Sequence, residues 1–216
     1  MHFVVLVATL FVIGSVAGYL TEVLYRRFVS RKIWMNPGFL VGPYLPIYGT
    51  GVVALFLISN VNLGIENAVF AVVLKVLLIG VMMTLIEFIA GLIFIKGLKI
   101  KLWDYSNQKG NIMGIICPVY SLIWLVVGSL YYFFLNPILL GALSWLSENL
   151  IYTFFIGAVV GMMVVDFAYS LHLGLKIQQF RELQGMRFEE FKKTLRDKRD
   201  GALNKLKAPK NGNGNA

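Results

Sequence analysis

Five long apolar segments decide what this chain can fold into. They cover roughly residues 3–24, 38–59, 67–95, 112–134 and 150–172. A helix crosses the hydrocarbon core of a bilayer with about 20 mostly apolar residues, so each segment is long enough to cross. Only 14% of the residues are charged, whereas a soluble domain carries about 25%. The sequence therefore predicts an all-α integral membrane protein with five transmembrane helices, and it excludes a water-soluble enzyme and a disordered chain.

The basic residues are unevenly distributed between the expected loops. Of the 20 lysines and arginines, 19 fall in the first loop, the third loop and the C-terminal tail. The second and fourth loops carry only Glu66 and Glu148. Because basic residues near span ends favour the cytoplasmic side, we expect the N-terminus outside and the C-terminus in the cytoplasm. We expect the first segment to be retained as a span rather than removed as a signal peptide.

The tail that follows the transmembrane domain (residues 1–173) has a basic amphipathic pattern over residues 174–207. Basic residues separate apolar residues at helical spacing: Phe180, Leu183, Phe188, Phe191 and Leu195. This pattern is typical of a helix on the anionic inner leaflet, and docking to a partner protein is the alternative. The neighbouring spans make lipid a simpler partner than nucleic acid. Residues 208–216 are rich in Asn and Gly and are expected to be disordered.

Four ionisable residues lie inside the expected spans, where a charge is costly: Glu22, Lys75, Glu87 and Asp166. With the predicted orientation, the three carboxylates fall in the cytoplasmic half of the membrane. Glu22 could pair with Arg26 one turn later. Glu87 and Asp166 lie deeper, and they either belong to a polar site or form structural hydrogen bonds. Lys75 lies in the outer half and could extend outward to the interface.

The second expected span is broken near its start. Two prolines remove backbone donors and two glycines permit sharp turns: Gly42, Pro43, Pro46 and Gly49. Irregular backbone at membrane depth is tolerated only when it is buried in protein or lines a cavity. Tyr44 and Tyr48 add hydroxyl groups there. The break therefore favours a binding site, and a kink that only shapes the fold is the alternative.

Small residues and one tryptophan predict contacts between helices. Gly14 with Gly18, and Gly157 with Gly161, have the spacing of close helix crossings. Trp124 lies inside the fourth span, and we expect it to pack between helices.

The sequence predicts no catalytic, metal or cofactor site. Cys117 is the only cysteine, and the two histidines, His2 and His172, are far apart in the chain. No Walker A or G-x-G-x-x-G pattern indicates a nucleotide site.

Several blocks occur in one order along the chain: GYLTE from Gly18, NPGFLVGPYLPIYG from Asn36, EFIAG from Glu87 and LWDYS from Leu102. Asn111 and Gly114 follow the last block. Between about Gly14 and Gly128 the chain resembles the bacterial ABC-transporter permease family, in its CmpB-like or type IV group. The matching residues are Glu22, Asn36, Gly42, Pro43, Tyr44, Pro46, Tyr48, Gly49, Glu87, Trp103, Asp104, Tyr105, Ser106 and Asn111.

The resemblance implies a multi-pass protein of the bacterial plasma membrane with a permease role. Taken with the polar residues inside the spans, it gives a set of candidate substrate-binding residues: Glu22, Tyr44, Tyr48, Glu87, Asp104 and Asp166. The remaining candidates are structural motif residues: Gly42, Pro43, Pro46, Gly49, Trp103, Tyr105, Ser106 and Asn111. On the cytoplasmic side, Asp104 and Ser106 could cap the turn before the fourth span or close the inner mouth of a polar cavity.

The function that we expect is that of a transporter permease subunit. Since the chain has no nucleotide motif, an ABC mechanism requires a separate ATPase, and five spans are few enough that a homo-oligomer is expected. A membrane-embedded enzyme acting on a lipid or isoprenoid, with Glu87 or Asp166 as acid or base, is the first alternative. A scaffold or sensor whose tail contacts the inner leaflet is the second.

Overall fold

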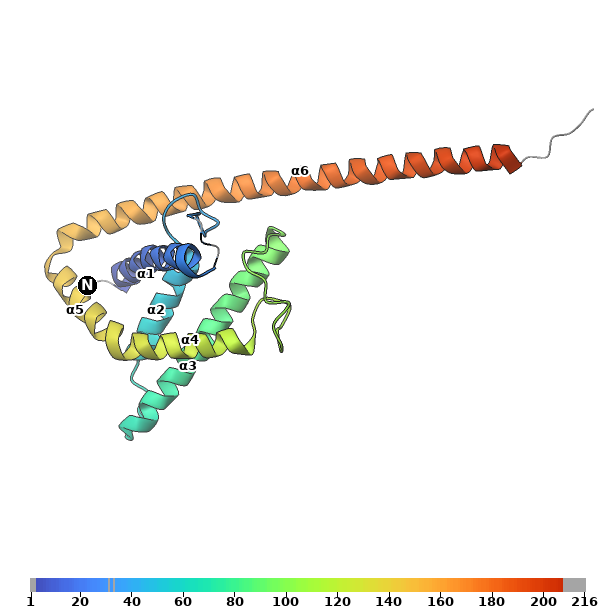
Figure 1. Ribbon diagram of the computed structural model, residues 1–216. Helices are drawn as coiled ribbons and strands as arrows, with labels where there is room; N and C mark the ends of the chain where they lie inside the picture. The colour runs from blue at the N-terminus through green and yellow to red at the C-terminus, as the bar shows by residue number, and fades with distance from the viewer. Residues whose placement is uncertain (1–2, 31, 33, 208–216) are drawn as a thin grey trace, which may run out of the picture. The chain divides into compact units, whose positions relative to one another are not determined.

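The computed structural model describes residues 3–30, 32 and 34–207, and the regular structure in these ranges is entirely helical (Figure 1). The prediction of an all-α protein is thus confirmed. The α-helices are α1 (Phe3–Tyr25), α2 (Pro46–Asn60), α3 (Ala68–Leu92), α4 (Pro118–Leu130), α5 (Asn136–Glu148) and α6 (Thr153–Lys207). Short π-helices are η1 (Arg26–Ser30), η2 (Ile93–Gly97) and η3 (Tyr131–Leu135), and η4 (Leu150–Tyr152) is a 3₁₀ turn.

The chain forms two compact units, residues 1–172 and residues 173–216. In the second unit the described backbone is helical as far as Lys207. The expected disordered end at 208–216 lies outside the described residues, and so do the side chains of the expected apolar stripe of the tail. The first unit contains every candidate site residue.

Four helical stretches of the described chain are long and apolar enough to cross a membrane: Phe3–Ser30, Ala68–Gly97, Pro118–Glu148 and Leu150–Lys176. The second expected span differs, because α2 begins only at Pro46 and has 15 residues. At 1.5 Å per residue, α2 is about 22 Å long. That is shorter than the hydrocarbon core of a bilayer, which is about 30 Å thick.

The region around the fourth expected span also differs from the prediction. Residues 112–117 form turns, with Gly114 at φ +68°, and the helix begins at Pro118. Residues 136–148 form α5, where the sequence predicts a loop. Pro137 is accepted there because it lies in the first turn of α5, after the π-helix η3.

The main core lies where α1, α2, α3, η3 and α5 meet. α1 packs on α2, α2 on α3, and α3 on α4, which crosses it in Figure 1. The buried side chains of this core are Leu10, Leu55, Phe56, Ile79, Met83, Tyr131 and Leu143. A second core joins α1 and the segment before α2 to the first turns of α6, through Val12, Leu40, Tyr44 and Met163.

Glycines allow α1 and α2 to approach closely. A Cβ atom on Gly18 would clash with the Tyr48 ring, and one on Gly14 would lie 2.7 Å from Val52 Cβ. The predicted close contact at this pair is confirmed. The same prediction is wrong for Gly157 and Gly161, since a Cβ at either position would meet no atom of the described chain within 4 Å.

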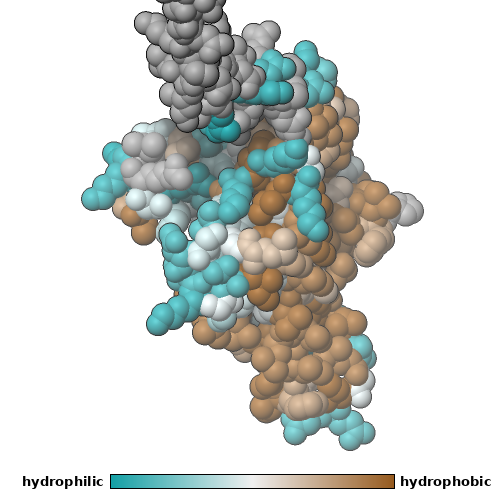
Figure 2. All heavy atoms as spheres, turned by 90° about the vertical axis from the view of Figure 1, so that its right-hand side faces the viewer, coloured by the Kyte–Doolittle hydropathy of each residue, from teal (hydrophilic) through white to brown (hydrophobic). Residues whose placement is uncertain are grey.

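The outer surface of the helices is strongly apolar. Figure 2 shows a broad hydrophobic band on one face, with hydrophilic side chains gathered at its edges. Val69, Phe154 and Val165 are each at least 70% exposed. Contiguous apolar surface of this extent is unfavourable in water. The four long apolar helices and this surface therefore fit a multi-pass membrane protein.

Polar contacts hold the C-terminal end of α2. The Lys75 ammonium of α3 donates to the carbonyl of Ser59 at 2.8 Å, and Asn60 donates to the Asn136 side chain at 2.9 Å. A cation at the last carbonyls of a helix is favourable for the helix dipole. Lys75 thus contacts the last turn of α2, whereas the sequence suggested an extension to the membrane interface.

We expect Gly49→Ala to destabilise the full chain in detergent, because the added methyl group would clash with Ser15 Oγ and the Phe11 carbonyl. Overpacking of this kind lowers the free energy of unfolding by about 1–3 kcal/mol. The matched control is Gly141→Ala, where a Cβ meets nothing within 4 Å. Equal unfolding midpoints for the two variants would contradict the α1–α2 contact.

Candidate functional site

The non-helical segment before α2 is organised by one amide side chain. Asn36 donates to the carbonyls of Leu40 at 2.8 Å and Val41 at 3.2 Å, and it accepts from the Gly38 N–H. The Leu45 N–H donates to the carbonyl of Ser15 in α1 at 2.9 Å. These bonds fix the segment against α1, while the N–H groups of residues 41 and 42 face α6.

Asp166 of α6 binds this segment. Its Oδ1 accepts from the Val41 N–H at 3.1 Å and from the Ser170 hydroxyl at 2.9 Å. Its Oδ2 accepts from the Gly42 N–H at 2.7 Å and from the Tyr44 hydroxyl at 2.8 Å. We call these five residues the Asp166 cluster. The four donors are neutral, so they satisfy the carboxylate oxygens without cancelling the charge.

Glu22 of α1 is also bonded at both oxygens. Oε1 accepts from Arg26 Nε at 2.8 Å, one turn later, which confirms the pairing suggested by the sequence. Oε2 accepts from the hydroxyl of Tyr48 in α2 at 3.1 Å. The Tyr48 ring meets the Trp124 ring of α4 edge-on, with centroids 6.3 Å apart. Glu22 is therefore in contact with α4 through Tyr48.

Glu87 of α3 is only 5% exposed, and its carboxyl group extends the contacts that run from Glu22 through Tyr48 to Trp124. Oε1 accepts from the Tyr105 hydroxyl at 2.9 Å, and Oε2 accepts from Trp124 Nε1 at 3.0 Å. The Tyr105 ring in turn stacks on Tyr120, with centroids 4.2 Å apart. We define the Glu87 cluster as Glu22, Arg26, Tyr48, Glu87, Tyr105 and Trp124.

Trp124 is the residue whose role the sequence analysis missed. It was expected only to pack between helices, yet its indole N–H binds the carboxyl group of Glu87. An indole N–H buried in an apolar span requires a hydrogen-bond acceptor, so the sequence already indicated that Trp124 needs a polar partner.

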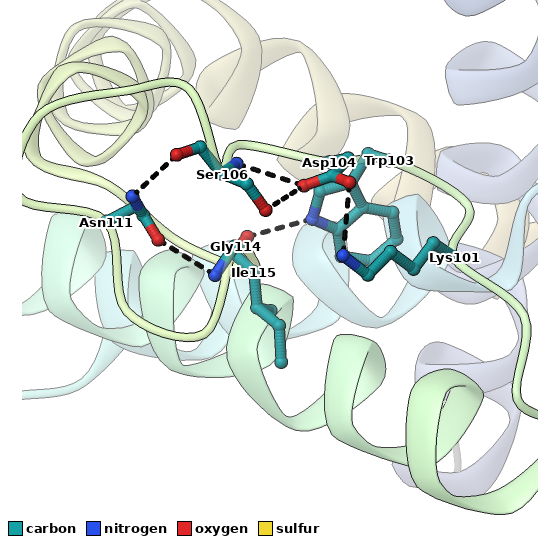
Figure 3. A network of polar contacts seen from close by, with 7 residues as sticks. All are labelled: Lys101, Trp103, Asp104, Ser106, Asn111, Gly114 and Ile115. Atoms are coloured by element: carbon teal, nitrogen blue, oxygen red, sulfur yellow. Dashed lines mark hydrogen bonds and ion pairs between the residues drawn. The ribbon is translucent and has the colours of Figure 1, made fainter.

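The loop between η2 and α4, which contains the LWDYS block, forms its own polar network (Figure 3). The Asp104 carboxylate accepts from the backbone N–H of Ser106 at 2.9 Å, from the Ser106 hydroxyl, and from Lys101 Nζ at 3.1 Å. The Asn111 side chain donates to the Ser106 carbonyl and accepts from the Gly114 N–H at 3.0 Å. Asp104 therefore closes a turn inside the loop, and the residue that precedes α4 is Cys117, which makes no side-chain cap.

Two further contacts orient the loop towards α3. Trp103 Nε1 donates to the Ile115 carbonyl at 2.8 Å, and the Tyr105 N–H donates to the Gly114 carbonyl at 2.8 Å. A Cβ atom on Gly114 would approach Asp104 Oδ1 at 3.0 Å, and its φ of +68° also favours glycine. The loop thereby presents the Tyr105 hydroxyl to Glu87.

The six candidate substrate-binding residues occupy three places. Tyr44 and Asp166 belong to the Asp166 cluster, and three others belong to the Glu87 cluster. Asp104 lies on the exposed loop, where it contacts the Glu87 cluster only through the next residue in the chain. Within the described part of the chain, no hydrogen bond joins the two clusters, and no group of three or more His, Cys, Asp or Glu side chains could hold a metal ion.

We expect Tyr105→Phe to destabilise the full chain by about 1 kcal/mol, because Glu87 loses one of its two hydrogen bonds. In a Glu87→Met background, Tyr105→Phe should lower the free energy of unfolding by less. Equilibrium unfolding in mixed micelles should therefore show a positive coupling energy between the two substitutions. The control is Tyr120→Phe, which removes the hydroxyl group from the ring that stacks on Tyr105. Additive effects of Tyr105→Phe and Glu87→Met would show that the contact is absent.

The Ser106 hydroxyl, the Ser106 N–H and Lys101 together lower the pKa of Asp104 from 3.8 to about 2. The carboxylate therefore stays ionised above pH 3.8, and its contribution to loop stability is lost as the pH falls from 3.8 towards 2. Ser106→Ala removes the strongest of these donors, so the pKa of Asp104 should rise towards 3.8. A carboxyl ¹³C NMR titration of Asp104 measures this shift, and an unchanged midpoint would contradict the hydroxyl contact.

Comparison with known proteins gives one family. No curated protein and no solved structure matches the chain significantly. The family model described as "Putative ABC-transporter type IV" matches residues 9–171, which include both clusters and the LWDYS loop. The match covers most of the chain and confirms the resemblance seen in the sequence motifs. The chain therefore belongs to the family described as "Putative ABC-transporter type IV".

Proposed function

We propose that the chain is the membrane-spanning permease subunit of an ABC-type transporter. Family membership and the four long apolar helices support this function. Since the sequence has no nucleotide-binding motif, a separate ATPase subunit would supply the energy.

One observation carries the proposal: polar side chains from four helices meet inside an apolar bundle. The Glu87 cluster takes residues from α1, α2, α3 and α4 and from the LWDYS loop. Ionisable groups within a membrane are costly, and they typically mark pathways for substrates or ions. A broken helix beside such groups is a common way for transporters to form a binding site.

The proposal includes a membrane arrangement with five spans, the N-terminus outside and the C-terminus in the cytoplasm of a bacterial cell. Residues 34–45 would supply the length that α2 lacks. Both clusters and the LWDYS loop would then lie in the cytoplasmic half, on the side from which an ATPase docks. The basic tail would contact anionic lipid, and a second copy of the chain would complete the assembly.

The substrate-binding residues in this proposal are Glu22, Tyr44, Tyr48, Glu87, Asp104 and Asp166. The three carboxyl groups inside the apolar helices already accept hydrogen bonds at both oxygens. A substrate could therefore interact in two ways. It could replace one of the tyrosine hydroxyls as a donor, or it could be attracted by the negative charge without donating a hydrogen bond.

The test is ATP hydrolysis by the assembly purified from native membranes in mild detergent. We expect a protein labelled by azido-ATP to accompany the full chain, and vanadate to inhibit hydrolysis. Glu87→Gln should lower the rate several-fold. The matched control is Glu148→Gln at the exposed end of α5, which should leave the rate unchanged. Hydrolysis that neither depends on the chain nor responds to Glu87→Gln would overturn the proposal.

A further inference from the structure

A groove of about 720 Å³ lies beside the Asp166 cluster. One wall is formed by α6 residues from Gly161 to Tyr169, and the other by Val41, Gly42 and Tyr44. All of these residues belong to the first compact unit. The volume falls within the range of small-molecule sites, about 300–1,000 Å³.

Most of the α6 wall is apolar and open to its surroundings. Met162 is 58% exposed and Val165 is 70% exposed. Gly161 leaves space between the walls, because a Cβ atom there would meet nothing within 4 Å. On a helix apolar enough to span a membrane, such a surface faces acyl chains, so an apolar ligand could enter the groove from the bilayer.

The polar part of the groove is the Asp166 carboxylate, and two tyrosines belong to the same lining. Asp166 lines it together with Tyr44 and Tyr169. The donors that bind the Asp166 carboxylate are all neutral. A carboxylate whose charge is not cancelled attracts a cation, so this part of the groove favours a positively charged group.

The hydrogen bonds of Asp166 also restrict the kind of cation. A carboxylate has about four lone-pair sites, and four donors already bind this one. A metal ion or a primary ammonium group would have to displace some of these donors, because each needs lone pairs of its own. A quaternary ammonium group has no N–H, so the charge of the carboxylate attracts it without any free lone pair.

The residues that line the groove include no lysine or arginine, so none of them would neutralise a phosphate group. We propose that this groove binds a quaternary ammonium amphiphile without a phosphate group. Its cationic head lies at Asp166, and its apolar chain lies along Met162 and Val165. The inference rests on the proposed function in one respect, since it treats Asp166 and Tyr44 as substrate-binding residues. The inference names the class of substrate that these two residues would bind.

The test is the binding of radiolabelled dodecyltrimethylammonium to the immobilised full chain in maltoside micelles. Unlabelled dodecyltrimethylammonium should displace the label, whereas dodecyl sulfate and dodecylphosphocholine at equal concentration should not. Equal displacement by dodecylphosphocholine would assign the groove to a lipid headgroup, and equal displacement by dodecyl sulfate would show partition without charge recognition. Either result would overturn the proposal.

Two variants test the charge of Asp166 and the volume of the groove separately. Asp166→Asn removes the charge, and Gly161→Leu fills the groove; each should weaken binding by about tenfold or more. The matched control is Gly157→Leu, which makes the same change one turn away, at a position that is also open but does not line the groove. If Asp166→Asn does not fold, Gly161→Leu decides, and wild-type binding by Gly161→Leu would overturn the proposal.

These results are independent of the ATP hydrolysis test. Binding without chain-dependent ATP hydrolysis would overturn the transporter function and leave the groove assignment standing. Chain-dependent hydrolysis without binding would overturn the groove assignment alone.

Discussion

The hydrogen bonds from the Val41 and Gly42 N–H groups to Asp166 make the non-helical segment before α2 possible. In the membrane arrangement that we propose, the backbone donors of this segment have no water to bind, so it persists only where the protein supplies acceptors. Asp166 provides two such acceptor oxygens, and the side chain of Asn36 binds two carbonyls of the same segment. The Asp166 carboxylate and the non-helical segment before α2 therefore depend on each other. The groove between them exists because α6 is held at the segment by polar contacts, with glycine rather than a side chain at position 161.

The Glu87 cluster depends on a different constraint, the close packing of helices at glycines. Gly18 lets the Tyr48 ring lie directly on α1, which brings the tyrosine hydroxyl to Glu22. Gly91 likewise accommodates Ile115 of the loop before α4, whose carbonyl anchors Trp103. Small residues thus bring the polar side chains of neighbouring elements within hydrogen-bond distance. A larger residue at Gly18 would push the Tyr48 ring, and with it the hydroxyl that donates to Glu22, away from α1.

Sequence reasoning predicted the helical class, the apolar segments and the pairing of Glu22 with Arg26, because each follows from local composition or one-turn spacing. It also identified Glu87 and Asp166 as residues that need partners. It could not name those partners, because Trp124 and the N–H groups of the segment before α2 are distant in sequence from the carboxylates that they bind. Helix α5 was also missed. The expected fourth span ended near residue 134, whereas the π-helix η3 leads directly into α5 at Asn136.

The π-helix η3 has a consequence for the orientation of α5. A π turn holds more residues than an α turn, and each residue rotates an α-helix by about 100°. The π turn therefore accommodates one extra residue while the α-helical residues on either side keep their orientation. Deleting one residue from Tyr131–Leu135 would favour a regular α turn and leave Asn136 facing Asn60 and Leu143 in the core. Deleting one residue between Asn136 and Leu143 would instead rotate the later side chains by about 100° and take Leu143 out of the core. A change of one residue is thus tolerated in η3 and not in the helix that follows it.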